Sequence, residues 1–329
     1  MKNNQLMIYG AYGYAGELMV REAVAQGLRP IIAGRDDEKL KPIATELSLE
    51  CRAFGVRNTG SNLQDISVLL NCAGPFSATA EPLARACLAQ QIHYLDITGE
   101  IDIFRKCHAL DEEARQQNVL ILPGAGTDIV PTDCLAAMLK EKLPVATRID
   151  LALSFGTNPS IGTVNTMIES FGKGGLIREG GMLKVVSNAF QMRKIPFQNK
   201  PQWAMTIPWG DVFTSGISTG VPDGAVYMAM PRMSIYMIRL TNPVKGILNT
   251  QFGQKITKRL AGWLMKKGPD AKALEAGRGQ FWGEAEAPDG EKLEMTMSTP
   301  NVYALTATVG IRIAQYCLDY TGPGGYYTP

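Results

Sequence analysis

Short apolar runs alternate with amphipathic stretches over the first 130 residues of the chain. One apolar run ends at Tyr9, and the stretch after it places Leu18, Met19, Val24 and Ala25 on one face of a helix. The alternation continues with apolar runs at 30–35, 67–73, 93–98 and 119–122, and with amphipathic stretches at 79–90 and 102–118. This order is typical of a parallel sheet covered by helices on both faces. We therefore predict an α/β fold with a doubly wound, parallel-sheet Rossmann domain.

The pattern changes after Pro131, where we expect a second domain to begin. Residues 148–155 are expected to form a strand, and a glycine-rich stretch then leads into a helix expected over 164–171. Five glycines between 172 and 181 predict a mobile loop or lid.

The end of the chain has a helical pattern over 300–320, with apolar residues three and four positions apart. Thr299 and Pro300 support a helix start there, because threonine caps helices and proline suits the first turn. The glycine-rich tail 324–329 is expected to be a loop.

Three glycines follow the first apolar run with the spacing G-x-x-G-x-x-G. Gly10 allows a tight turn, Gly13 lets the backbone approach a diphosphate, and Gly16 permits close packing of the next helix on the strand. A helix that begins there directs free N–H groups at an anion. We expect the whole turn to bind a dinucleotide cofactor: Gly10, Ala11, Tyr12, Gly13, Tyr14, Ala15 and Gly16.

Arg35 lies at the tip of the second predicted strand, directly after Gly34. This position meets the adenosine ribose, where a guanidinium suits a 2′-phosphate and a carboxylate suits a free 2′-hydroxyl. We therefore predict NADP as the cofactor. Asp36 and Asp37 follow at once, so NAD is the alternative.

Ligands of such sheets bind beyond the carboxyl ends of the strands. Two of these ends supply further candidate cofactor contacts, namely Cys72, Ala73, Gly74 and Pro75 at one and Thr98 and Gly99 at the next. Candidate proton donors are Asp96, Glu100 and Asp128, because a buried carboxylic acid has a raised pKa and can donate a proton. In the competing interpretation, Glu100 and Asp128 hold loop backbone or ribose hydroxyl groups. Neither histidine is well placed for catalysis, and a structural role is expected for His93 and His108.

Composition places the chain among enzymes rather than nucleic-acid binders. Apolar residues make up 45% and charged residues 19%, and the net charge is only +2, with the basic residues dispersed. The six cysteines lie far apart without metal-ligand spacing, so we expect no metal. The first strand begins almost at Met1, which leaves no room for a signal peptide and predicts a cytoplasmic protein.

Methionines are frequent between Tyr227 and Met265. Such a segment fits a groove for a greasy, acyl-type substrate or a peripheral contact with a membrane surface. We favour the other interpretation, in which these residues pack in the core and in a homodimer contact. Pro231 and Pro243 break the run, which excludes a spanning helix.

Five motifs together resemble a known family: the G-A-Y-G-Y-A-G turn, A-G-R, N-C-A-G-P-F, Y-L-D-I-T-G-E and P-G-A-G-T-D-I-V-P-T-D. Their order is similar to that in saccharopine dehydrogenase-like reductases, in the branch that includes trans-acting enoyl reductases. Weaker similarity occurs at Gly162-Thr163 and from Gly277. The resemblance implies a dinucleotide-binding domain over 1–130, an inserted mixed α/β domain for substrate or oligomerisation over 131–299, and a C-terminal helix within 300–329 that returns to the first domain.

The resulting hypothesis is an NADP-dependent oxidoreductase that transfers a hydride to a C=C, C=O or C=N bond of a small or lipid-like molecule. The alternative is a scaffold or sensor that binds the dinucleotide without catalysis. No tyrosine has a lysine four positions later, so the proton donor is not evident from a known dyad.

Overall fold

A computed structural model describes residues 4–155, 174–240, 242–244, 250 and 277–329. The chain divides into two compact units, residues 1–130 with 303–329 and residues 131–302. We expected the divisions after residues 130 and 299. The helix predicted over 164–171 lies outside the described residues.

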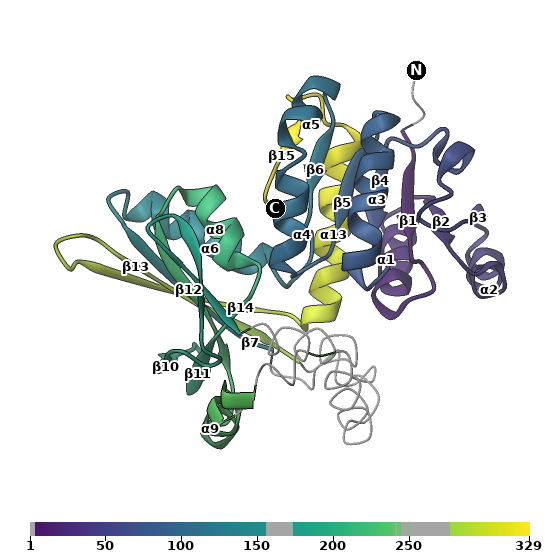
Figure 1. Cartoon of the computed structure of the whole chain (residues 1–329). Coiled ribbons are helices and arrows are strands. Elements are labelled where there is room, and N and C mark those ends of the chain that lie inside the picture. Colours follow the sequence, from purple (N-terminus) through teal and green to yellow (C-terminus); the bar gives the residue numbers. More distant parts are fainter. Residues whose placement is uncertain (1–3, 156–173, 241, 245–249, 251–276) are drawn as a thin grey trace. The chain divides into compact units, whose positions relative to one another are not determined.

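The first unit contains a seven-stranded sheet in the order β15-β6-β5-β4-β1-β2-β3, in which every neighbouring pair is parallel (Figure 1). Its strands are β1 (Leu6–Tyr9), β2 (Ile31–Gly34), β3 (Cys51–Ala53), β4 (Val68–Asn71), β5 (His93–Asp96), β6 (Leu120–Leu122) and β15 (Gly325–Tyr326). The order runs outward in both directions from β1 and β4, which is the doubly wound arrangement. The predicted fold class is therefore confirmed.

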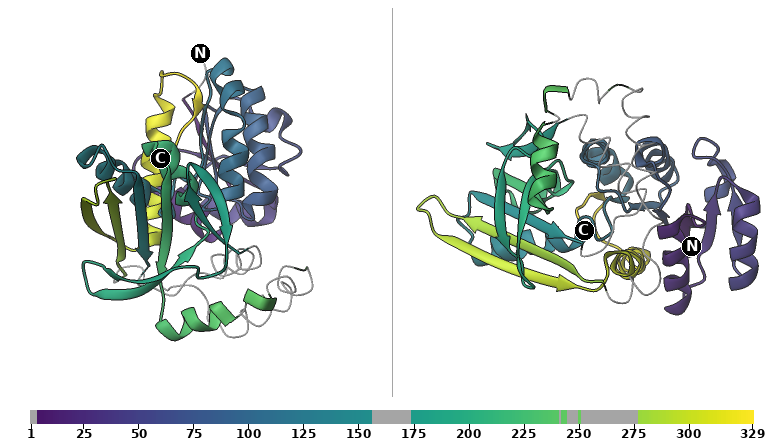
Figure 2. Two further views of the ribbon diagram at one scale, coloured as in Figure 1. Left: turned by 60° about the vertical axis from the view of Figure 1, so that its left-hand side comes forward. Right: turned by 90° about the horizontal axis from the view of Figure 1, so that it is seen from below.

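Helices cover both faces of this sheet (Figure 2). One face carries α1 (Tyr14–Ala25), α2 (Asp37–Leu47) and α13 (Val302–Leu318). The other carries α3 (Phe76–Ala89), α4 (Ile101–His108) and α5 (Asp111–Gln117). A short 3₁₀-helix, Gly60–Leu63, precedes β4.

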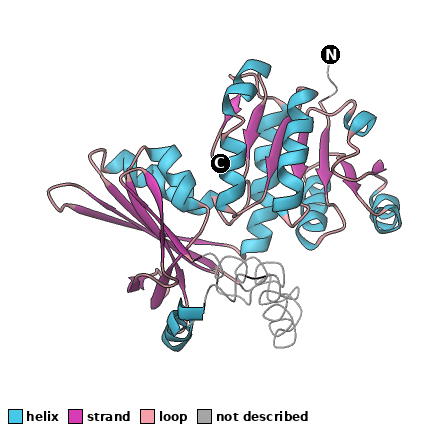
Figure 3. Ribbon diagram, in the orientation of Figure 1, coloured by secondary structure: helices cyan, strands magenta, loops and turns pink. Residues whose placement is uncertain are grey.

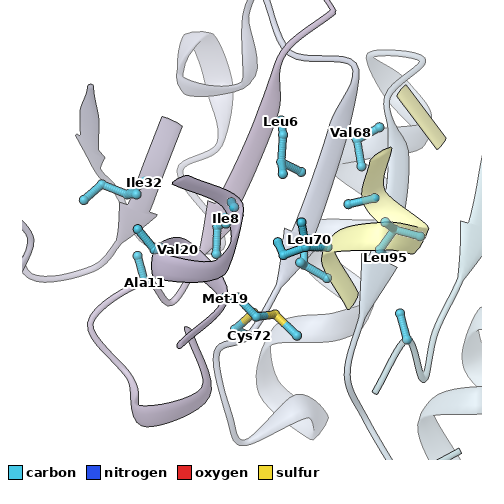
Figure 4. Close-up of a cluster of buried hydrophobic side chains, with 14 of the residues drawn as sticks. Leu6, Ile8, Ala11, Met19, Val20, Ile32, Val68, Leu70, Cys72 and Leu95 are labelled. Carbon is cyan, nitrogen blue, oxygen red and sulfur yellow. The ribbon is translucent and has the colours of Figure 1, made fainter. Parts of the chain in front are cut away.

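The core between the sheet and α1 is built from alternate strand residues (Figure 4). Ile8, Leu70 and Leu95 are completely buried and belong to three neighbouring strands. The Sγ of Cys72 lies 3.2 Å from the Sδ of Met19 on α1. Burying each large aliphatic side chain contributes about 1.5–3 kcal/mol, so this layer fixes the strands whose ends form the candidate site.

The single helix predicted over 102–118 is two helices, so that prediction was wrong. The Leu110 N–H donates to the Cys107 carbonyl in a tighter, 3₁₀-type bond, and α5 then begins at Asp111. Leu110 is 4% exposed, so the break turns its side chain into the core.

The glycine-rich tail contains the two-residue strand β15, Gly325–Tyr326, where we expected only a loop. β15 pairs with β6, and the Tyr326 N–H donates to Oδ1 of Asp111 at 2.7 Å. The Gly324 N–H donates to Oδ1 of Asn118 at 3.0 Å.

The second unit is a mixed sheet in which β7 and β12 are parallel and the other pairs are antiparallel (Figure 3). The strands are β7 (Arg148–Ser154), β8 (Gly175–Glu179), β9 (Met182–Val186), β10 (Met192–Pro196), β11 (Pro201–Ile207), β12 (Asp223–Ala229), β13 (Gly279–Glu286) and β14 (Lys292–Thr299). The helices among the described residues of this unit are α6 (Val130–Lys142), α8 (Asp211–Thr219) and α9 (Arg232–Leu240), with a 3₁₀-helix at Asn242–Val244. This confirms the mixed α/β second domain.

The predicted lid is a β-hairpin where it is described. Gly180 and Gly181, with φ of 57° and 78°, form the two-residue turn between β8 and β9. Two successive positive φ values suit this kind of turn, so the glycines serve hairpin geometry here. Residues 172 and 173 lie outside the described residues.

The methionines of the 227–265 segment differ in burial. Met228 in β12 is 5% exposed, whereas Met233 and Met237 on α9 are 70% and 63% exposed. Met265 lies outside the described residues. Within the described parts of the chain, no helix is long and apolar enough to cross a bilayer.

Candidate functional site

The turn between β1 and α1 is held by backbone hydrogen bonds. The N–H groups of Gly10 and Ala11 both donate to the Ala33 carbonyl, at 2.7 and 3.1 Å, and Gly10 has a φ of 85°. Gly13 is the N-cap of α1 and supplies no side-chain cap. The N–H groups of the first helical turn lack partners within the helix, so they can bind an anion.

Two glycines of this turn allow close backbone approach. A Cβ at Gly16 would lie 2.2 Å from the Gly10 carbonyl oxygen, and a Cβ at Gly10 would lie 2.7 Å from the Ala73 nitrogen. The turn therefore touches the loop after β4, and no larger residue fits at either position. The third glycine, Gly13, has a Cβ position 3.2 Å from the Gly10 carbonyl oxygen.

At the tip of β2, Arg35 is exposed and its neighbour Asp36 is already engaged. The Asp36 carboxylate caps α2 by accepting from the Lys39 N–H at 3.4 Å, and it pairs with the Lys39 ammonium at 3.1 Å. Its hydrogen bond to Lys39 lowers the pKa of Asp36. The Lys39 ammonium also lies 5.6 Å from the centre of the Tyr12 ring, and that ring covers Gly34.

The β4 loop, residues 72–75, lies beside this turn. Its Ala73 N–H donates to Oδ1 of Asn71 at 3.0 Å, and its Ala73 carbonyl accepts from Oγ1 of Thr79 at 2.6 Å. The space where a Gly74 Cβ would stand is open, and the Gly74–Pro75 peptide is cis. Burial raises the pKa of the Cys72 thiol, which favours packing over a nucleophilic role.

The β5 loop, residues 97–100, and the β6 loop, residues 123–129, meet at Gly99. A Cβ at Gly99 would lie 3.3 Å from Oδ2 of Asp128. The Glu100 N–H donates to Oγ1 of Thr98 at 3.1 Å. Burial raises the pKa of the Asp128 carboxyl to about 6, so much of it is protonated in mildly acidic solution.

Asp96 is completely buried at the end of β5. Its Oδ1 accepts from the N–H groups of Thr98 and Gly124, each at 3.0 Å, and its Oδ2 accepts from the Tyr94 hydroxyl at 2.9 Å. Burial raises the pKa of Asp96 to about 6, although these hydrogen bonds oppose the shift. Both oxygens of the Asp96 carboxylate are therefore engaged by Tyr94 and by the loops after β5 and β6.

All the predicted site residues lie at the carboxyl ends of parallel strands, but not all of them touch. The glycine turn contacts the β4 loop, and the β5 loop contacts the β6 loop. His93 is at the other end of its strand, where its Nδ1 accepts from the Leu120 N–H at 2.9 Å. His108 ends α4, with its ring 5.1 Å from that of Tyr326.

The sequence reasoning missed Asn71, Thr79, Tyr94 and Lys39. The sequence held a signal for Tyr94 and for Asn71. Tyr94 is two positions from the predicted site residue Asp96 in the same strand, so the two side chains share a face of the sheet. Asn71 is a polar residue at the end of an otherwise apolar strand.

Comparison with known families agrees with this geometry. Residues 6–122 match the family described as the saccharopine dehydrogenase NADP binding domain. This part of the first unit is therefore similar to the saccharopine dehydrogenase NADP binding domain. The matched residues include the glycine turn, Arg35 and the β4 and β5 loops.

Two relatives extend the similarity beyond that domain. The chain is 25% identical over 231 residues to the saccharopine dehydrogenase-like oxidoreductase of Rattus norvegicus, covering 61% of this chain and 53% of the relative. It is 28% identical over 205 residues to a candidate trans-acting enoyl reductase of Mycobacterium tuberculosis, covering 56% of this chain and 44% of that protein. The chain thus spans about half the length of these curated relatives.

Apo saccharopine dehydrogenase (L-Glu forming) from Saccharomyces cerevisiae has a similar structure. The TM-score is 0.66 with 10% sequence identity, and the match covers 99% of this chain and 94% of that chain. At this identity the likeness concerns the fold, and it includes the second unit as well as the first.

Proposed function

We propose that this chain is an NADP-dependent oxidoreductase acting on a C=C, C=O or C=N bond of a small or lipid-like molecule. The observation that carries the proposal is the amino end of α1, which has no side-chain cap and follows a turn where Gly10 and Gly16 lie too close for any Cβ, at the centre of a doubly wound sheet. This arrangement suits a pyrophosphate bound by main-chain N–H groups. The oxidoreductase names of the relatives agree with it.

The preference for NADP over NAD is supported by the charges at the end of β2. Asp36, which could accept from a ribose 2′-hydroxyl, is used as the cap of α2 and as the partner of Lys39. Arg35 is exposed directly before it and makes a suitable partner for a 2′-phosphate.

When bound, NADPH supplies the hydride. Asp128 is our candidate for the proton donor, because its pKa of about 6 keeps part of it protonated near neutral pH. Its proton would go to the substrate atom that gains negative charge as the hydride adds to the neighbouring atom. Glu100, one residue from Gly99, is the second candidate, and Asp96 is the third, with both of its carboxylate oxygens already accepting hydrogen bonds.

The experiment is calorimetry on the folded chain with NADPH and NADH, followed by absorbance measurements with carbonyl, imine and enoyl compounds. We expect tighter binding of NADPH and its consumption with at least one class of acceptor. Binding without consumption across the panel would favour the scaffold or sensor. Absence of heat with both nucleotides would remove the proposal altogether.

A further inference from the structure

A chain of buried polar side chains crosses the sheet beneath the candidate site. Nδ2 of Asn71 in β4 donates to the Tyr94 hydroxyl of β5 at 3.2 Å, and this hydroxyl donates to Oδ2 of Asp96 at 2.9 Å. All three residues are 0% exposed. We call Asn71, Tyr94 and Asp96 the buried polar chain.

At its β4 end, the buried polar chain fixes the loop that lies against the glycine turn. Oδ1 of Asn71 accepts from the Ala73 N–H, and Nδ2 of Asn71 also donates to Oγ1 of Thr79 at 3.2 Å. Thr79 in turn donates to the Ala73 carbonyl. Asn71 thus holds the Ala73 N–H directly and the Ala73 carbonyl through Thr79.

At its other end, the buried polar chain fixes both loops that carry the candidate proton donors, Glu100 and Asp128. Oδ1 of Asp96 joins the N–H of Thr98, two residues before Glu100, to the N–H of Gly124, four residues before Asp128. The backbone carbonyl of Asp96 accepts from the Ala125 N–H at 2.6 Å. One carboxylate therefore links the β5 and β6 loops.

Such a network is costly unless it is complete, since an unpaired buried polar group destabilises the fold. Here each link has a partner, and the links join strands β4, β5 and β6, which are neighbours in the sheet. A fully satisfied buried network favours one arrangement of the elements that it connects.

We propose that Asn71, Tyr94 and Asp96 are positioning residues that hold the β4, β5 and β6 loops in one arrangement, so that a dinucleotide bound at the β4 loop meets Asp128 and Glu100. This inference rests on the proposed function for the role of the loops. It adds that contact at the β4 loop is transmitted to the other two loops through the Tyr94 hydroxyl.

The test is hydrogen exchange of the full chain, with and without saturating NADPH. We expect NADPH to slow exchange in peptides covering residues 97–100 and 123–129 of the wild-type chain. In Tyr94→Phe, exchange in both loops should be about tenfold faster and should no longer respond to NADPH, while NADPH still binds.

The matched control is Tyr9→Phe. Tyr9 is also buried, and its hydroxyl donates one hydrogen bond, to the Phe54 carbonyl at 2.9 Å. This bond is not part of the buried polar chain. This variant loses the same group with a similar effect on stability, but its β5 and β6 loops should respond to NADPH as in the wild type.

A pH series separates a positioning role from a merely structural one. The titratable groups facing Asp96 among the described residues are Cys72, Tyr94 and Cys107, and burial raises the pKa of all three. These three groups therefore stay neutral in this pH range, and within this cluster only Asp96, with a pKa of about 6, changes charge. The hydrogen bonds from the Thr98 and Gly124 N–H groups favour the charged form of Asp96, so protonation weakens them while Asp96 stays buried. In the wild type, local protection of the two loops, corrected for intrinsic exchange, should therefore fall below about pH 6, even though the global stability of the fold rises. Asp96→Asn should show no such step, although it retains Asp128.

Each outcome is decisive. If NADPH binds all variants and the loops exchange alike in the wild type, Tyr94→Phe and Asp96→Asn, the positioning role is overturned. If NADPH fails to bind the wild type, the proposed function fails, but faster loop exchange in unliganded Tyr94→Phe would still support the positioning role. If Tyr94→Phe does not fold, Thr79→Val replaces it, with faster exchange expected at 72–75 and unchanged exchange contradicting the proposal.

Discussion

At the scale of single residues, Arg35 is an exposed cation at the tip of β2, and its neighbour Asp36 pairs with Lys39 instead. Arg35→Ala should weaken NADPH binding by about 1–3 kcal/mol, the range for a lost charge-assisted hydrogen bond, and should change NADH binding little. Calorimetry with both nucleotides measures the difference. Arg29→Ala, at the opposite end of β2, is the control. An equal loss for both nucleotides would show that Arg35 does not bind the 2′-phosphate.

Asp96 links function to stability through its raised pKa. The folded chain holds a proton on Asp96 up to about pH 6, whereas the unfolded chain releases it near pH 4, so stability falls as pH rises between these values. Asp96→Asn has no carboxyl group to ionise at this position, so it does not lose stability in this way. Relative to the wild type, its free energy of unfolding should therefore rise by about 1 kcal/mol between pH 5 and pH 7.5.

Urea unfolding of both proteins at the two pH values measures this change. Asp36→Asn makes the same substitution where the pKa is lowered, so its stability difference from the wild type should stay constant over that range. A constant difference for Asp96→Asn as well would mean that its pKa is not raised.

At the scale of elements, the sequence was informative where a local pattern determines local structure. The spacing of Gly10, Gly13 and Gly16 predicted the turn, because Gly16 and Gly10 sit where any Cβ would overlap the backbone. The break at Leu110 could not be seen, since the helical periodicity runs through both α4 and α5. The alternation in residues 292–299 was a usable strand signal that we did not apply.

The buried polar chain shows the limit of such reasoning. Asn71 and Asp96 become neighbours only because β4 and β5 pair in one register, with Asn71 opposite Asp96. No local spacing indicates that pairing. The sequence therefore indicated which loops lie at the carboxyl ends of the strands, but not the side chains that hold these loops together.

The turn between β1 and α1 yields a prediction for the whole element. Gly13 has a φ of −75°, which valine also adopts, and a Cβ there would be 3.2 Å from the Gly10 carbonyl oxygen. Gly13→Val should therefore keep the fold with a small loss of thermal stability. It should reduce NADPH affinity by about a hundredfold or more, because the side chain blocks the first-turn N–H groups.

The control places a valine at the other end of α1. Ala25 is exposed there, so Ala25→Val should leave NADPH binding intact. Thermal melts and calorimetry on the two variants give the comparison. Unchanged affinity in Gly13→Val would remove the assignment of this turn to a pyrophosphate.

At the scale of the whole molecule, the first unit depends on both ends of the chain. Ala307, Ile311, Ala314 and Cys317 of α13 belong to the same core as α1 and the central strands. A Cβ at Gly310 would lie 2.5 Å from the Cε of Met19, so α13 packs closely against α1. The second unit, residues 131–302, is thus inserted into a domain that is complete only after the chain returns.

Removing residues 303–329 should therefore unfold the first unit and abolish NADPH binding, because the face of the sheet that α13 covers would be exposed to water. The second unit should keep slow hydrogen exchange in β7 and β12, since its own sheet is untouched. Removing only 324–329, which deletes β15 at the sheet edge, should lower stability but preserve NADPH binding, because the cofactor loops lie on other strands. Hydrogen exchange and calorimetry on the two truncated chains distinguish these outcomes, and normal NADPH affinity in the longer deletion would show that residues 4–130 fold without α13.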